Sequence, residues 1–371
     1  MNRLNLCFVG PAASVNVRRW VDWFVRRGHT CTLMTVEPVA DSEAVAFHQV
    51  NLACSNVGRK LGRLLSAIRL VRAVVRMKPD VVHAHYVRGL AWGLLGAPSR
   101  CMVVTPWGSD VLTEQGAFRE WYSRELTGRL LKRAALVTTH SAYMESRIRR
   151  LVPGQQSIAR VGWGVNLERF KPGLDVTMVR RRWRIENQQP VIFSPRLAQP
   201  LYNHDLVIKA LPAVRRNVPN VLLVITEHFA DPDYLRHLQR LAARLGITDH
   251  VRFIEEANYE DMPYWFNVAA AVVMVPSSDG MPNSLLETIA CGAVPVLNRL
   301  PQYEELIRDE VNGRYVELHE DQLASVLTDV LLDVRYRKTC GLANRALAEQ
   351  TADQEREMVR MESLYCELAG R

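Results

Sequence analysis

One short part of the chain predicts a strand, a loop, a helix and a second strand in immediate succession. The apolar run 269–275 is typical of a strand buried on both faces, and the run 294–297 is typical of another. Between them, a loop rich in turn residues leads into helical spacing over residues 283–291. Two strands joined by a crossover helix form a parallel pair, so this segment predicts an α/β sheet.

The same segment places two carboxylates where such a sheet binds ligands. Open parallel sheets bind ligands at the carboxyl ends of their strands. Asp279 closes the loop at such an end, and Glu287, eight positions later, is expected to face inward one to two turns into the helix. Asn283 or Ser284 is expected to cap that helix, whose N–H groups and positive dipole end can hold a diphosphate.

Strand and helix patterns alternate through the rest of the chain. Apolar runs of strand length occur at 4–9, 31–36, 80–85, 101–105, 135–139, 190–194, 221–225, 251–254, 270–275, 294–297 and 313–316. Helical spacing occurs at 16–27, 60–77, 204–216, 233–245, 260–268, 283–291, 320–334 and 338–371. A chain of 371 residues is too long for one core. We therefore predict two domains, 1–172 and 173–350, followed by a C-terminal helix over 351–371.

The distribution of charge and of cysteine favours a particular kind of partner and cellular location. Residues 1–190 carry 29 Lys and Arg against 13 Asp and Glu, whereas residues 191–371 carry 18 against 26. The first half therefore suits an anionic partner. The seven cysteines are scattered without a CxxC pair or metal-ligand spacing, which favours reduced thiols, a cytoplasmic location and no metal centre. The amino terminus reads as a first strand, too short for a signal peptide, and no apolar stretch approaches the roughly 18 residues of a membrane span.

The acidic segment from Ser278 to Glu287, with Ala290-Cys291-Gly292 after it, resembles the motif of retaining family 4 glycosyltransferases. That family has the GT-B fold, in which two Rossmann-like parallel-sheet domains face a central cleft and the C-terminal helix crosses back to the first domain. The resemblance implies that Glu287 holds the ribose of a sugar nucleotide and that Asp279, where the family usually has Glu, meets the transferred sugar. It also implies that residues between them hold the sugar and phosphates: Gly280, Met281, Pro282, Asn283, Ser284 and Leu285.

Two more strand ends in the second half carry the resemblance. Ser194-Pro195-Arg196-Leu197 is similar to the family's Gly-Arg-Leu, whose arginine contacts the donor diphosphate, a task that suits the forked guanidinium. The lysine that the family places about five residues later is absent, and Asn203 or His204 is the candidate to replace it. The resemblance also places the main chain of Ala257 and Asn258 against the nucleobase.

The first half is expected to supply the acceptor side of the cleft. The small-residue loop after the first strand is not GxGxxG, so a dinucleotide cofactor is not predicted. Many relatives have His-Gly-x-Asp where this chain has Trp107-Gly108-Ser109-Asp110, so His85, at the end of another strand, is predicted to take the histidine's catalytic role; a structural histidine is the alternative. The residues predicted to line the acceptor side are Gly10, Ser14, Asn16, Trp107 and Asp110.

Together these features predict a retaining glycosyltransferase with a nucleoside diphosphate sugar as donor. Asp279, Arg196 and His85 are its predicted catalytic residues, and neither metal nor cofactor is expected. Its acceptor is expected to be a saccharide or a lipid-linked sugar, in cell-surface polysaccharide or glycolipid assembly. The alternatives are a sugar-nucleotide 2-epimerase of the same fold and a non-catalytic sugar-nucleotide-binding partner of an assembly complex. Nucleic acid is not an expected partner, because no stacking aromatics interleave with the basic residues.

The segment 59–78 holds seven cations and no acid, with leucine, isoleucine and valine between them. A second basic stretch, 119–133, includes Trp121 and Tyr122. One hypothesis is that this basic face lies on an anionic membrane, on its inner side, near a membrane-proximal acceptor. The alternative is that the apolar side chains pack on the sheet and the arginines are merely solvated: Leu61, Leu64, Leu65, Ile68 and Val71.

Overall fold

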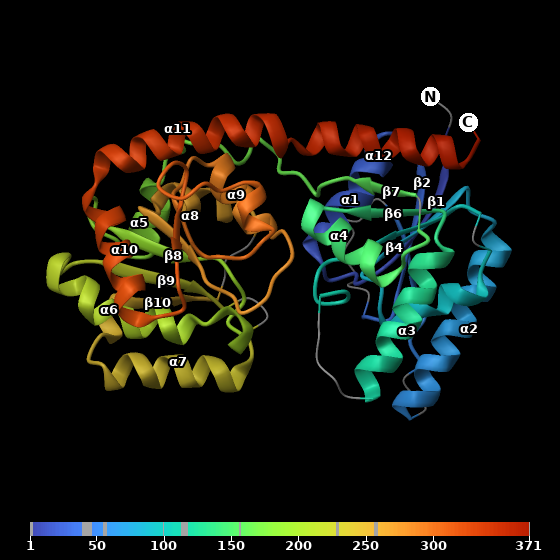
Figure 1. The fold of residues 1–371 in the computed structure, drawn as a ribbon, viewed down its shortest axis with the longest axis horizontal. Helices are drawn as coiled ribbons and strands as arrows, with labels where there is room; N and C mark the ends of the chain where they lie inside the picture. Colours follow the sequence, from blue (N-terminus) through green and yellow to red (C-terminus); the bar gives the residue numbers. More distant parts are fainter. Residues whose placement is uncertain are drawn as a thin grey trace. The chain divides into compact units, whose positions relative to one another are not determined.

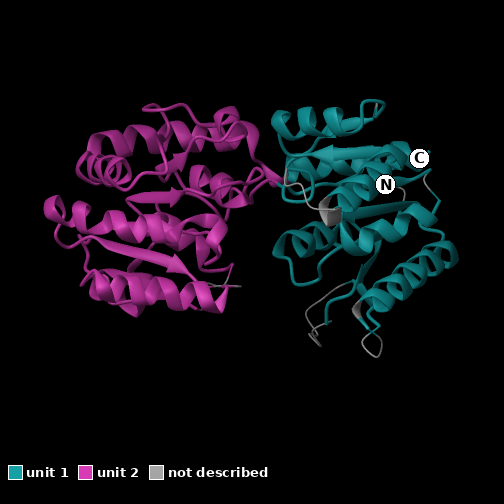
Figure 2. Ribbon diagram, turned by 60° about the horizontal axis from the view of Figure 1, so that its bottom comes forward, with its two compact units in different colours: residues 1–163, 355–371 teal, residues 164–354 magenta. Residues whose placement is uncertain are grey.

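The computed structural model describes residues 3–38, 47–54, 58–98, 100–112, 118–155, 157–227, 230–255 and 259–370. The chain divides into two compact units, which we call unit 1 (residues 1–163 and 355–371) and unit 2 (residues 164–354), shown in Figure 2. Each unit is built around its own parallel sheet (Figure 1). Within the described residues, no helix is long and apolar enough to cross a membrane. The predicted fold of two parallel-sheet domains is confirmed.

The sheet of unit 1 has seven parallel strands in the order β3-β2-β1-β4-β5-β6-β7. The strands are β1 (Asn5–Val9), β2 (Thr30–Thr35), β3 (His48–Asn51), β4 (Val81–His85), β5 (Met102–Thr105), β6 (Leu136–Thr139) and β7 (Ile158–Arg160). The helices are α1 (Val15–Arg26), α2 (Arg59–Met77), η1 (Gly89–Gly96), α3 (Phe118–Arg133) and α4 (Ala142–Leu151). Alternate strand residues enter opposite cores, as Leu6 and Phe8 join one apolar cluster while Cys7 and Val9 join the other.

The sheet of unit 2 has six parallel strands in the order β10-β9-β8-β11-β12-β13. The strands are β8 (Val191–Ser194), β9 (Leu222–Thr226), β10 (Val251–Ile254), β11 (Ala271–Met274), β12 (Pro295–Asn298) and β13 (Arg314–Val316). The helices and short turns of helix are α5 (Thr177–Arg182), η2 (Pro200–Tyr202), α6 (His204–Asn217), α7 (Pro232–Arg244), η3 (Thr248–His250), α8 (Met262–Val268), α9 (Asn283–Ala290), η4 (Tyr303–Glu305), α10 (Glu320–Leu332) and α11 (Val334–Thr351). All six strands predicted for this half are present.

The C-terminal segment is two helices instead of the single helix expected over 338–371. α11 ends at Thr351 and belongs to unit 2, and α12 (Gln354–Leu368) packs on unit 1, as the resemblance implied. Its glutamate Glu362 forms an ion pair with Arg27, at 2.9 Å between Nη2 and Oε2. Residues 164–172, assigned to the first domain from the sequence, lie in unit 2, where the main chain of Val165 pairs with residues 352–354.

Candidate functional site

The acidic segment lies at the point of the unit 2 sheet where the strand order reverses. β8 and β11 are neighbours in the sheet, although β9 and β10 separate them along the chain and continue the sheet on the far side of β8. The loops that follow β8 and β11 therefore leave the sheet in opposite directions and open a crevice between them. The first loop carries Arg196 and the second carries Asp279.

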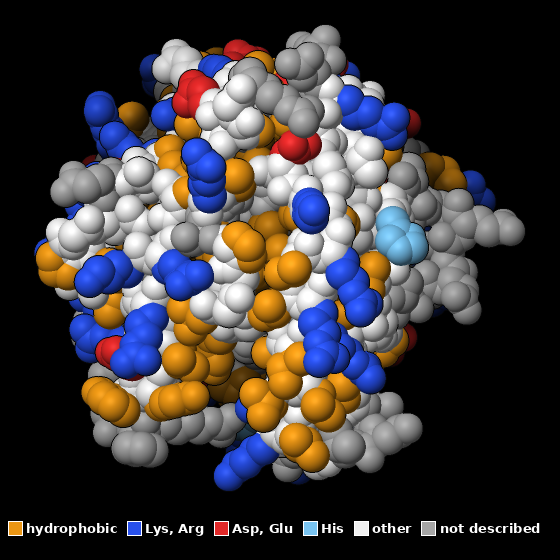
Figure 3. All heavy atoms as spheres, turned by 90° about the vertical axis from the view of Figure 1, so that its right-hand side faces the viewer, with side chains coloured by type: hydrophobic (Ala, Val, Ile, Leu, Met, Phe, Trp, Pro, Cys, Tyr) orange, Lys and Arg blue, Asp and Glu red, His pale blue; other side chains and the backbone are white. Residues whose placement is uncertain are grey.

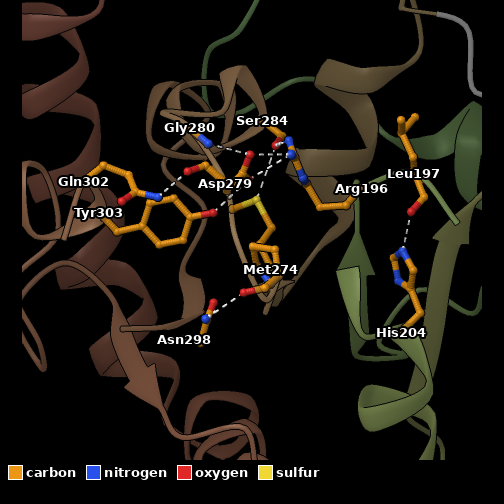
Figure 4. Close-up of polar contacts among 11 residues, drawn as sticks. Arg196, Leu197, His204, Met274, Asp279, Gly280, Ser284, Asn298, Gln302 and Tyr303 are labelled. Atoms are coloured by element: carbon orange, nitrogen blue, oxygen red, sulfur yellow. Dashed lines mark hydrogen bonds and ion pairs between the residues drawn. The ribbon is translucent and has the colours of Figure 1, made fainter. Parts of the chain in front are cut away.

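Three protein donors converge on the carboxylate of Asp279 (Figure 4). The Nη2 atom of Arg196 lies 3.0 Å from Oδ1 and 2.8 Å from Oδ2. The hydroxyl of Tyr303 donates to Oδ2 at 2.9 Å, and the backbone N–H of Gly280 donates to Oδ1 at 2.9 Å. The Asp279 carbonyl accepts from Nε2 of Gln302 at 2.7 Å, so both the side chain and the backbone of Asp279 are held.

Arg196 joins this carboxylate to the start of α9. Its Nη1 donates to Oγ of Ser284 at 3.1 Å, and its guanidinium lies 4.5 Å from the ring centroid of Tyr202. Within the described part of the chain, Nε of Arg196 has no hydrogen-bond partner although it is buried. Burial by itself would lower the pKa of Arg196, but Asp279, Tyr202 and Tyr303 together outweigh it, so the pKa is raised and the guanidinium stays charged.

The ionisation of this cluster follows from its burial and contacts. Burial raises the pKa of the Asp279 carboxyl, while Arg196, Tyr303 and Gly280 stabilise its ionised form. Burial and the neighbouring Asp279 raise the pKa of Tyr303 well above its ordinary value, so its hydroxyl donates as a neutral phenol. The cluster is therefore a carboxylate and a guanidinium, both largely shielded from water, beside a helix N-terminus.

His204 and Asn203 support the loop that carries Arg196. His204 is fully buried, with Nδ1 3.1 Å from Oγ of Ser194 and Nε2 2.9 Å from the carbonyl of Leu197 (Figure 4). Burial lowers its pKa to about 4, so the ring is neutral at neutral pH. Asn203 donates from Nδ2 to the carbonyl of Val275 at 2.8 Å. Both residues proposed to replace the family's lysine thus hold the two loops in place.

The start of α9 differs from the prediction that Asn283 or Ser284 caps it. Pro282 is the N-cap residue, and its carbonyl accepts from the N–H of Leu285 at 3.1 Å. Asn283 and Ser284 are the first two helical residues, and neither makes a side-chain cap. The capping prediction is wrong because proline begins the helix one residue earlier and the Ser284 hydroxyl contacts Arg196 instead.

The other residues predicted to bind the donor are placed differently by the structure. Met281 and Leu285 are buried in an apolar cluster of unit 2, so only their main chain remains for a ligand. Glu287 is buried one turn into α9, as predicted, with 5% of its surface exposed. Ala257 and Asn258 lie outside the described residues.

A pocket of about 350 Å³ lies in unit 1, at the carboxyl ends of β1, β2 and β4. Its lining includes three of the residues predicted for catalysis or the acceptor side: Gly10, His85 and Trp107. Glu37, Tyr86 and Arg88 line it as well, and no motif in the sequence had indicated them. Ser14 precedes α1 and Asn16 lies in its first turn; neither lines this pocket.

The two histidines of β4 have different surroundings. Both ring nitrogens of His85 are buried without a hydrogen-bond partner among the described residues, and its ring centroid lies 5.1 Å from that of Trp20 and 5.3 Å from that of Trp163. Burial, with a smaller effect of His140, lowers the pKa of His85 to about 3. His83 contacts the hydroxyls of Tyr365 and Thr105, which gives it a structural role.

Asp110 lies inside its loop and does not line the pocket. Its carboxylate accepts backbone N–H bonds from Val87, Trp107 and Gly108, each at 2.9 Å. It therefore holds the loop that places Trp107 at the pocket, where the indole Nε1 is buried without a partner in the described residues. The described residues contain no group of three or more His, Cys, Asp or Glu side chains that could hold a metal ion.

Two family models match the chain. Residues 175–346 match the model described as glycosyl transferases group 1, and residues 5–141 match the model described as glycosyl transferase 4-like. A GDP-mannose-dependent alpha-(1-6)-phosphatidylinositol monomannoside mannosyltransferase of Mycolicibacterium smegmatis is 29% identical over 221 residues, covering 57% of this chain and 57% of that protein. A D-inositol 3-phosphate glycosyltransferase of Salinispora arenicola is 31% identical over 195 residues, covering 49% and 43%. The chain thus matches about half the length of these curated relatives.

Among solved structures, HepE of Anabaena in complex with UDP-glucose superposes with a TM-score of 0.82. The alignment covers 98% of this chain and 99% of HepE at 16% sequence identity. At that identity the likeness concerns the fold, which in both chains is a pair of Rossmann-like domains of the GT-B type.

Proposed function

The chain belongs to the group 1 glycosyl transferases, and we propose that it moves a sugar from a nucleoside diphosphate sugar to an acceptor hydroxyl with retention of configuration. One arrangement carries this proposal: a charged Arg196, with only 15% of its side chain exposed, reaches the N-terminus of α9 at the point where the unit 2 strand order reverses. A guanidinium and a helix N-terminus both favour phosphate, and together they suit the diphosphate that leaves in the reaction.

The two acids are assigned different ligands. Arg196, Gly280 and Tyr303 already make four contacts with the carboxylate of Asp279, so we propose that a hydroxyl of the transferred sugar replaces one of these contacts. Glu287 lies one turn into α9, eight residues after Asp279, and is assigned to the ribose of the nucleotide. Its burial makes a charged hydrogen bond to a ribose hydroxyl stronger than it would be in water.

The chemistry proposed for this site is electrostatic. As the sugar–phosphate bond breaks, negative charge grows on the diphosphate, and Arg196 with the N–H groups of α9 stabilises it. Because these groups supply positive charge themselves, we propose that transfer needs no divalent metal and survives a chelator. His85, neutral at neutral pH, contributes hydrogen bonds to a ligand in the unit 1 pocket and does not supply a proton.

The substrates are proposed from the relatives and from the unit 1 pocket. One relative is named for GDP-mannose and HepE holds UDP-glucose, which supports a nucleoside diphosphate hexose as the donor. The pocket lined by Gly10, His85 and Trp107 is assigned to the acceptor, a saccharide or lipid-linked sugar of cell-surface polysaccharide or glycolipid assembly. The seven free cysteines support a cytoplasmic site of action.

Calorimetry with a sugar nucleotide and with the free nucleoside diphosphate tests the roles of the acids. Glu287→Gln should weaken both ligands by about tenfold to more than a hundredfold, the effect of losing a charged hydrogen bond. Asp279→Ala should abolish turnover yet keep or tighten nucleoside diphosphate binding, because Arg196 is left without its counter-ion. Glu317→Gln, an exposed acid of unit 2, is the matched control. Equal loss of nucleoside diphosphate affinity in both site variants would refute the assignment.

Arg196→Lys separates the guanidinium from a simple positive charge. Lysine keeps the charge but cannot contact Asp279 and Ser284 from one planar group, so activity should still fall by about tenfold or more. Full activity would mean that the diphosphate is bound by backbone N–H groups alone.

Product analysis of the same protein distinguishes the other two activities that the sequence allows. A transferase releases free nucleoside diphosphate only with an acceptor, whereas a sugar-nucleotide 2-epimerase forms the epimer without one. Tight donor binding with neither product would identify a non-catalytic binding partner.

A further inference from the structure

The helix α2 has two apolar faces, and only one of them is buried. Leu70 and Val74 are buried in the core of unit 1. Leu61, Leu64, Ile68 and Val75 have 52%, 58%, 39% and 50% of their surface exposed. Their spacing of three, four and seven residues places these four side chains in one stripe along the helix. The alternative in which Leu61, Leu64 and Ile68 pack on the sheet is therefore wrong; Leu65 and Val71 are half-buried.

Positive charge borders this apolar stripe on both sides. At 3.6 residues per turn, Arg72 and Arg76 lie along one side of the stripe, and Lys60 lies along the other. All three side chains are exposed, and α2 contains no acidic residue. A helix that lies in a membrane interface has this pattern, with an apolar stripe that enters the lipid and flanking cations that meet the head groups.

Aromatic side chains extend the same surface onto the neighbouring helix. Trp121 and Tyr122, near the start of α3, have 61% and 51% of their surface exposed. The turn of helix η1 lies between α2 and α3: a Cβ at its Gly93 would meet the Cα of Ala67 at 3.0 Å, and its Trp92 ring lies 6.4 Å from that of Tyr122. The first turns of α2 and α3 lie at the same end of unit 1 (Figure 1). Tryptophan and tyrosine favour the boundary between lipid and water.

A groove of about 660 Å³ between α3 and residues 151–154 carries further positive charge. Its lining includes Trp121 and three cations, Arg124, Arg129 and Lys132, together with one acid, Glu125. On the side of the molecule seen in Figure 3, hydrophobic side chains are interspersed with Lys and Arg, and few acidic side chains are visible.

We propose that this surface binds an anionic lipid bilayer. The docking surface consists of Leu61, Leu64, Ile68, Val75, Trp121 and Tyr122 with the cations beside them. A second copy of the chain would bring like charges together at the same place, whereas acidic lipid neutralises the cations and takes up the apolar side chains. The proposal goes beyond sugar transfer and does not depend on it, because binding to lipid is measured without any substrate.

Vesicle flotation of the whole protein is the test. The protein should float with vesicles of mixed phosphatidylcholine and phosphatidylglycerol and stay behind with phosphatidylcholine alone, and added salt should weaken the binding. Equal binding to both kinds of vesicle, or to neither, would overturn the proposal.

Paired variants test the apolar stripe. L61Q with L64Q should release the protein from acidic vesicles, since two exposed leucines can no longer enter the lipid. L332Q with L342Q is the matched control, because these leucines of unit 2 have 60% and 69% of their surface exposed. The proposal fails if the two double variants bind acidic vesicles equally well. It also fails if light scattering shows that the wild type is a dimer and that L61Q with L64Q is a monomer.

Charge variants complete the test. The first removes three exposed cations of α2 that border the stripe: K60Q, R72Q and R76Q. The second removes three exposed cations of unit 2: R216Q, R244Q and K338Q. Each cation near an acidic leaflet strengthens binding about fivefold, so the first variant should bind about 100-fold more weakly. An equal loss in the second variant would show that net charge alone, and no defined surface, drives the binding.

Discussion

Replacing His204 with glutamine should remove a specific part of the protein's acid sensitivity. His204 begins α6 and is fully buried, with Ser194 and Leu197 in contact with its two ring nitrogens. A protonated ring could not accept from the serine hydroxyl and would place a charge in the apolar interior near Arg196. The folded protein therefore keeps His204 neutral, whereas the unfolded chain protonates it readily.

The size of the effect follows from the two pKa values. Burial holds the folded pKa at about 4, against about 6.5 in the unfolded chain. Because the folded pKa is the lower one, this contribution to stability is present above pH 6.5 and is lost as the pH falls towards 4. From about pH 7 to about pH 5 the loss is about 2 kcal/mol, and it reaches about 3 kcal/mol at lower pH.

Hydrogen exchange of β8 and α6, followed by mass spectrometry, measures this stability within unit 2. At about pH 7, His204→Gln should be the less stable protein, by about 1–3 kcal/mol, because it loses a buried hydrogen bond. At about pH 5 that difference should shrink by about 2 kcal/mol, since only the wild type still carries the buried histidine. His237→Gln, an exposed change on α7, is the control. A difference between wild type and variant that does not change with pH would refute the reasoning.

Two further substitutions test packing in unit 2. Tyr303→Phe should cost about 1.5–3 kcal/mol in urea unfolding, because Asp279 loses a donor that lies 2.9 Å away; unchanged stability would show that this bond contributes nothing. Gly164→Ala should cost about 2–4 kcal/mol, since its φ is +62° and the new Cβ would lie 2.4 Å from the Cα of Gln354. Gly173→Ala, with φ +80° and no atom within 4 Å, should cost only about 1 kcal/mol, and equal effects of the two alanines would contradict the steric argument.

The sequence predicts the buried strands of both sheets well and the two edge strands of unit 1 poorly. Runs such as 270–275 are apolar throughout because both faces of an inner parallel strand are covered. β3 (His48–Asn51) and β7 (Ile158–Arg160) were not predicted: they are short and partly polar, as edge strands with one unpaired side can be. α4 (Ala142–Leu151) was missed as well, since arginines interrupt its apolar spacing.

The sequence placed Arg196 and Asp279 in one site but treated them as separate ligands of the donor. That they contact each other depends on β8 and β11 being neighbours in the sheet, and the spacing of residues along the chain does not determine this order. Tyr303 was missed for the same reason, because it reaches Asp279 from η4, beyond the next strand. Because Arg196 and Asp279 form an ion pair, substitution of one also alters the charge environment of the other, and the effects of the two substitutions should not be additive.

The two faces of α2 show why apolar spacing alone cannot assign a helix to the core. Leu70 and Val74 recur at helical spacing, and so do Leu61, Leu64 and Ile68, so either set could have been the buried one. The structure shows that Leu70 and Val74 are the buried set. The exposed set, Leu61, Leu64 and Ile68, has the larger side chains. Exposed leucines carry a cost in water that a core position would have removed, and the cations beside them would repel the same surface of a second copy. A bilayer surface accounts for both features at once, whereas solvation of the arginines explains the charge and leaves the exposed stripe without a partner.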